Sequence, residues 1–117
     1  MTYMEQFTQN QLQTAYEEMR PDFREKLFPG GLEQAGALAK GIAALIYPGT
    51  DCFAAHYRTC FEFYLTYALA RLMGCTEERA EAECKSKYGT LSPMIFQAVV
   101  ELCREALYQV FPTLEGK

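Results

Sequence analysis

The segment CFAAHYRTC, residues 52–60, is the part of the chain whose residue types could carry out chemistry. It contains the only histidine, His56, with Cys52 and Cys60 four residues to either side. Thiolate and imidazole are preferred ligands of zinc, and a cysteine beside a histidine can form an activated nucleophile. The spacing therefore raises two chemical hypotheses, a metal site and a Cys-His nucleophile, to be weighed against a structural role.

A single metal ion cannot bind all three side chains from one regular helix. Residues four apart share a helix face, but eight residues separate Cys52 from Cys60, which is about 12 Å along the axis. Zinc holds its ligands at about 2.0–2.3 Å. At most His56 and one cysteine could share an ion, and the other ligands would have to come from elsewhere, for example from Cys84 or Cys103.

A structural role explains more of this segment than either chemical hypothesis does. The nucleophile lacks partners, because no motif supplies an orienting third group or an oxyanion pocket. On a helical wheel, the cysteines and His56 share a broad face with aromatic residues, namely Phe53, Tyr57, Phe63, Tyr64 and Tyr67. Free cysteine behaves as a small buried hydrophobe. We therefore predict that this face belongs to the core, and we predict no catalytic, cofactor-binding or metal-binding residue.

The helices that position these residues can be read from the apolar pattern. Apolar residues recur every three or four positions rather than every two, which indicates helices, and proline or glycine separates the segments. We expect helices at residues 3–19, 32–47, 51–73, 77–88 and 93–111, and a turn at 22–28 that could be helical. Short connections favour antiparallel neighbours. The sequence therefore predicts one all-α domain, residues 1–117, built as a compact bundle of four long helices and one shorter helix.

The ends of the later helices are marked by residues suited to capping. Thr76 and Ser92 stand where the N-caps of two helices are expected, and Pro93 occupies the first helical position after Ser92. Gly74 and Gly89 follow the last apolar residues of the preceding helices, where glycine commonly ends a helix.

The second half of the helix expected at 51–73 is apolar on nearly all sides. Its outer side continues from Arg58 and Glu62 into Leu65, Leu69 and Met73. A helix that is apolar all round is buried all round, either inside its own domain or against a second chain. Because two-fold dimers are the commonest oligomers, we predict that Leu65, Leu69 and Met73 form the interface of a homodimer or of a complex with another protein.

A small-molecule site is the alternative hypothesis for the same helix. Tyr64 and Tyr67 could line an aromatic pocket, with Arg71 as an anchor for an anion. The structural interpretation, which we favour, is that Arg71 is partly exposed and packs its stem on Tyr67.

Charge and hydropathy exclude several classes of partner. The chain has 11 basic and 15 acidic residues and a net charge of −4, which argues against nucleic acid as a partner. The most apolar window, residues 61–73, is too short to cross a membrane. An odd number of cysteines and a polar N-terminus without a signal peptide indicate reduced thiols and a cytoplasmic location.

No phosphate-binding loop, hydrolase elbow or zinc-finger spacing occurs in the sequence. We therefore expect a non-enzymatic cytoplasmic helical protein without a cofactor, which acts through self-association or by binding another protein. Binding of a small ligand in an aromatic pocket is the alternative, and a Cys/His metal site on the helix at 51–73 is the least favoured hypothesis.

Overall fold

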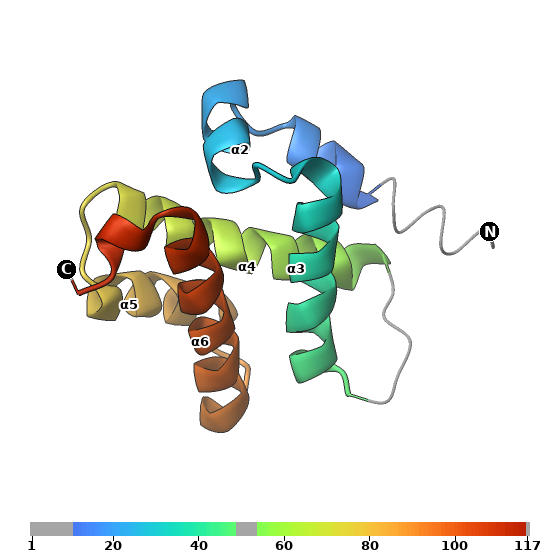
Figure 1. The fold of residues 1–117 in the computed structure, drawn as a ribbon. Helices are drawn as coiled ribbons and strands as arrows, with labels where there is room; N and C mark the ends of the chain where they lie inside the picture. Colours follow the sequence, from blue (N-terminus) through green and yellow to red (C-terminus); the bar gives the residue numbers. More distant parts are fainter. Residues whose placement is uncertain (1–10, 49–53, 117) are drawn as a thin grey trace. The chain divides into compact units, whose positions relative to one another are not determined.

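Helices account for every regular element of the structure, a computed structural model that describes residues 11–48 and 54–116. Residues 11–17 are helical. The following elements are α2 (Pro21–Leu27), α3 (Gly31–Ile46), α4 (Ala54–Leu72), α5 (Glu77–Tyr88), α6 (Pro93–Val110) and the 3-10 turn η1 (Pro112–Leu114). The predicted all-α fold class is confirmed (Figure 1).

The observed helix bounds follow the predicted ones closely. The segment predicted at 77–88 coincides with α5, and the turn at 22–28 is the short helix α2. The first helix ends at residue 17 rather than 19. The parts of the prediction at residues 3–10 and 51–53 lie outside the described residues.

The chain forms two compact units, Met1–Phe61 and Glu62–Lys117, whose boundary falls within α4. Each helix belongs to one unit except α4, whose first half belongs to the first unit and whose second half belongs to the second. The candidate site described below lies entirely within the second unit. Whether the two units act as one domain stays a prediction.

Aromatic contacts hold the helices of the first unit together. Phe28, which is 2% exposed, stacks on Phe61 of α4 with ring centroids 5.5 Å apart. The Tyr16 ring is tilted against Phe28 with centroids 6.0 Å apart. An ion pair of 2.9 Å between Arg58 and Glu18 links α4 to the end of the first helix. The ion pair joins residues 40 positions apart in the sequence, so it fixes tertiary and not local structure.

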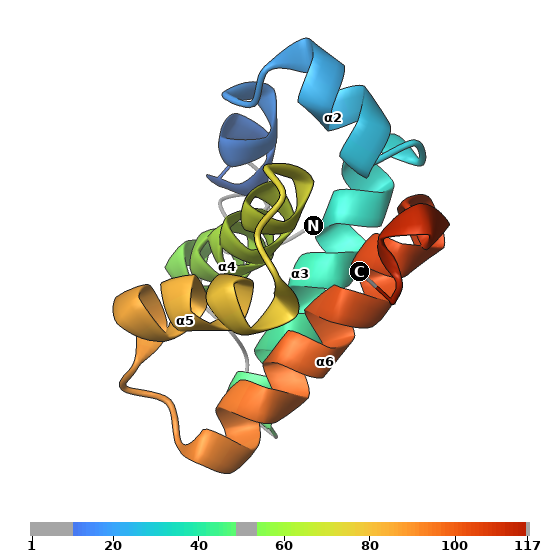
Figure 2. The ribbon, with the colours of Figure 1, turned by 90° about the vertical axis from the view of Figure 1, so that its left-hand side faces the viewer.

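The second unit consists of the second half of α4, α5, α6 and η1. Its helix starts are capped as predicted: the Thr76 hydroxyl oxygen accepts from the backbone N–H of Arg79, and the Ser92 hydroxyl oxygen accepts from that of Ile95. After the turn at 73–76, α5 runs back beside α4 (Figure 1), and Figure 2 shows the same pair from the side.

The two predicted glycine stops work by different physical means. Gly74 adopts a φ of +95°, in the left-handed region that favours glycine. Gly89 has a right-handed φ of −70°, but a Cβ at this position would lie 2.7 Å from the carbonyl oxygen of Lys85. Lack of a side chain is therefore required at both positions, for backbone conformation at Gly74 and for space at Gly89.

Candidate interaction groove

The three predicted interface residues lie together on the surface of the second unit. Leu65 and Leu69 are half-buried, and Met73 is 84% exposed. All three line a groove of about 550 Å³ between α4 and α5, which we call the α4–α5 groove. Whether these three residues form an interface stays a prediction.

The α4–α5 groove has an apolar side and a charged border. Its apolar lining comes from Leu65, Leu69 and Ala70 on α4 and from Met73 directly after that helix. The charged lining residues are Glu62 on α4 and Arg79, Glu83 and Lys87 on α5. An apolar centre bordered by charges is the usual composition of protein interfaces.

The direction of α5 relative to α4 follows from contacts between the helices at one end of the groove and from the turn at the other. Away from the turn, the Phe63 ring packs on Tyr88 with centroids 4.9 Å apart, and the Cys84 thiol lies 3.9 Å from the Phe63 carbonyl oxygen. At the other end, the backbone N–H of Cys75 donates to the carbonyl oxygen of Ala70. The two helices are therefore antiparallel along the groove.

The charged side chains of α5 alternate in sign along the groove. Arg79 and Glu83 form an ion pair of 3.3 Å one helical turn apart. Lys87 follows one turn later, is exposed, and forms no ion pair with the residues that the structure describes. The order along α5 is therefore positive, negative, positive, with the negative Glu62 on the facing helix.

The structure corrects the interpretation of Arg71 as a partly exposed side chain. Arg71 is only 3% exposed. Its guanidinium donates to the carbonyl oxygens of Cys75 and Leu114, each at 2.8 Å, and to the Tyr108 hydroxyl at 3.0 Å. These acceptors belong to the protein itself, which assigns Arg71 a structural role.

Arg71 also has an aromatic partner that the sequence did not predict. The guanidinium lies over the Tyr108 ring, 5.8 Å from its centroid, whereas packing of the Arg71 stem on Tyr67 stays a prediction. The Tyr108 hydroxyl in turn donates to the carboxylate of Glu77. Sequence reasoning missed Tyr108 because its separation from Arg71, 37 residues, carries no local signal.

The aromatic pocket proposed near Tyr64, Tyr67 and Arg71 does not gain support. Tyr64 and Tyr67 are 1% and 0% exposed. They do not line the α4–α5 groove. They also do not line the two other grooves of the described residues, one between α5 and α6 (the α5–α6 groove) and one in the first unit beside Leu12 and Tyr57. Burial raises the pKa of both tyrosine hydroxyls above the ordinary value, which keeps them neutral.

The segment CFAAHYRTC is described only from its third residue onwards. Cys52 lies outside the described residues, so the pair Cys52 and His56 is not observed. The His56 ring stacks on Tyr47 with centroids 4.2 Å apart, and Cys60 is buried at 2% exposure. Within the described ranges, no group of three His, Cys, Asp or Glu side chains is placed to hold a metal ion.

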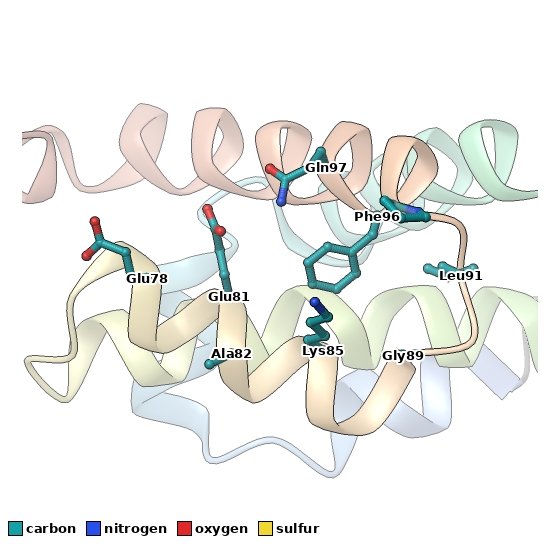
Figure 3. A pocket seen from close by; sticks show the side chains of 9 residues that line it. Glu78, Glu81, Ala82, Lys85, Gly89, Leu91, Phe96 and Gln97 are labelled. Atoms are coloured by element: carbon teal, nitrogen blue, oxygen red, sulfur yellow. The ribbon is translucent and has the colours of Figure 1, made fainter.

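A second groove of the same unit, of about 440 Å³, lies between α5 and α6. Figure 3 shows the Phe96 ring of α6 turned toward α5, with Glu81, Lys85 and Gln97 around it. Phe96 is 6% exposed, and its ring packs edge-on against Phe63 with ring centroids 5.8 Å apart. The largest apolar side chain of this groove therefore already belongs to the core.

No family model, curated protein or solved structure matches this chain. Among the described helices, none has the length and hydropathy needed to span a membrane.

Proposed function

We propose that this chain is a non-enzymatic helical protein that acts by self-association through the α4–α5 groove. The observation that carries the proposal is Met73, 84% exposed beside the accessible Leu65 and Leu69. Scattered exposed apolar residues are ordinary, but contiguous ones that are bordered by charges are typical of interaction surfaces.

Association would stabilise the complex mainly by removing these apolar side chains from water. Burial of apolar surface contributes about 25 cal/mol per Å², and methionine adapts its shape readily to a partner surface. Binding of a different protein through the same groove is the alternative proposal, and it predicts a monomeric chain that still depends on Met73 for its partner.

A matched pair of methionine variants tests the proposal. Met73 and Met94 are 84% and 83% exposed, but Met94 lines none of the three grooves described above. In native mass spectrometry at micromolar concentration, the wild type and Met94→Glu should be dimers. Met94→Glu introduces the same charge as Met73→Glu at an equally exposed position, but outside the groove. Met73→Glu should be monomeric, because it places a charge in the apolar contact.

Two outcomes would contradict self-association through this groove. The first is a wild type that stays monomeric at high micromolar concentration. The second is a dimer that Met73→Glu and Met94→Glu weaken to the same degree, which would place the interface elsewhere. Circular dichroism of each variant checks that its helix content is unchanged.

A further inference from the structure

We infer that a second copy of this chain fills the α4–α5 groove with the two-fold axis running along the groove, so that Glu62 of each copy pairs with Lys87 of the other. The inference rests on the proposed self-association and adds the arrangement of the two copies. It follows from the order of the charges around the groove.

Three of the four charged residues lie at an end of the groove, and Glu83 lies between the ends. Because Phe63 contacts Cys84 and Tyr88, the neighbouring residues Glu62 and Lys87 both lie at the end away from the turn. Met73 and Arg79 lie at the other end, beside the turn at 73–76. Glu83 stands midway between Arg79 and Lys87, one helical turn from each.

A two-fold axis across the groove would bring like charges together. With such an axis, one end of the groove lies against the opposite end in the second copy. The two α5 helices then lie against one another in antiparallel directions. Arg79 would then face Lys87 of the partner subunit. Glu83, midway between the two positions, would face Glu83 of the partner subunit. Like charges placed opposite one another across an interface are strongly unfavourable.

A two-fold axis along the groove brings opposite charges together instead. With this axis, the end of the groove beside the turn lies against the same end in the second copy. It sets α5 against α4 of the partner subunit. Lys87 then faces Glu62 of the partner subunit, and symmetry repeats the pair. Arg79 keeps its ion pair with Glu83 in its own chain, and the apolar residues of the two α4 helices meet along the axis.

Charge reversal in two separate preparations tests this arrangement. Glu62→Lys alone sets lysine against lysine twice, and Lys87→Glu alone sets glutamate against glutamate twice. Each variant should weaken its homodimer by about tenfold or more. In an equimolar mixture, both cross-subunit pairs of the heterodimer again have opposite charges, so the heterodimer should recover most of the wild-type affinity.

Native mass spectrometry reads the result, with one variant labelled with heavy nitrogen so that homodimers and heterodimers separate by mass. Lys85→Glu is the matched control, since Lys85 is an exposed lysine of α5 that lines the α5–α6 groove instead. A mixture of Glu62→Lys with Lys85→Glu should show no preference for the heterodimer. The neutral variants Glu62→Gln and Lys87→Gln provide a second measurement: each should weaken the dimer, and the double variant should weaken it little further.

The outcomes separate this inference from the proposed function. If the wild type is a dimer that Met73→Glu disrupts, but the two reversed variants do not prefer one another, the lengthwise arrangement is wrong and self-association stands. A monomeric wild type overturns both.

Discussion

The guanidinium of Arg71, near the end of α4, donates a hydrogen bond of 2.8 Å to the carbonyl oxygen of Leu114, 43 residues farther along the chain. The same side chain also bonds to Cys75 in the turn after α4 and to Tyr108 on α6. One nearly buried cation therefore joins three segments of the second unit. Its positive charge is compensated by oxygen acceptors and by Glu77, which accepts from Tyr108.

Replacing Arg71 should destabilise the protein far more than replacing an exposed arginine. Arg71→Met removes a buried cation and leaves three partly buried acceptors without their donor, so we expect the free energy of unfolding to fall by about 3 kcal/mol. The control is Arg20→Met, because the ion pair of Arg20 with Asp22 is solvent-exposed and such pairs contribute at most about 1 kcal/mol. Urea denaturation measures both, and equal losses would contradict the structural role of Arg71.

Tyr67 and Tyr108 should respond in opposite ways to loss of the hydroxyl. The buried Tyr67 hydroxyl has no hydrogen-bond partner among the described residues, whereas the Tyr108 hydroxyl bonds to both Arg71 and Glu77. Tyr67→Phe should therefore leave stability unchanged or raise it by about 1 kcal/mol, while Tyr108→Phe should lower it by about 1–3 kcal/mol. Thermal and urea denaturation of the two variants check the contrast, and a destabilised Tyr67→Phe would contradict a Tyr67 hydroxyl without a hydrogen bond.

Stability should decline at alkaline pH because burial keeps a cysteine thiol and a tyrosine hydroxyl of the second unit in their neutral forms. Burial raises the pKa of the Cys84 thiol from 9.0 to about 12, so the folded state keeps a proton that the unfolded state releases. This contribution is fully present below pH 9.0, and it is lost as the pH rises toward 12. Burial also raises the pKa of Tyr64 from 10.0, which adds to the loss at higher pH.

Urea unfolding at neutral pH and at about pH 10.5 measures this decline. Cys84→Ala should show a smaller decline than the wild type, because one of the protected protons is removed. Cys75→Ala is the control, since Cys75 lies partly exposed at the end of the turn. Stability that rises between the two pH values would contradict the burial of these groups.

Local features of the fold were predictable where their physics is local. The start of α5 at Glu77 and the start of α6 at Pro93 match the prediction, because each cap is a hydrogen bond between residues three positions apart. The helical nature of the chain follows from a periodicity that any window of the sequence contains. The groove residues Leu65, Leu69 and Met73 were identifiable for the same reason, since they share one side of a single helix.

The environment of Arg71 was not predictable, and neither were the borders of the groove. The acceptors of Arg71 at Tyr108 and Leu114 are 37 and 43 residues away, so the interpretation from Tyr67 alone placed the side chain wrongly at the surface. Likewise, Arg79, Glu83 and Lys87 border the groove only because α5 turns back along α4.

The sequence by itself determined the helices of this protein, their caps and the apolar side of α4, because these depend on interactions within a few residues. Only the tertiary structure decided that Arg71 is buried, that Tyr67 and Tyr64 are enclosed, and that Met73 stays exposed beside a row of alternating charges. Burial and charge neighbourhood depend on which distant helices pack together, and that choice is made by the whole chain at once.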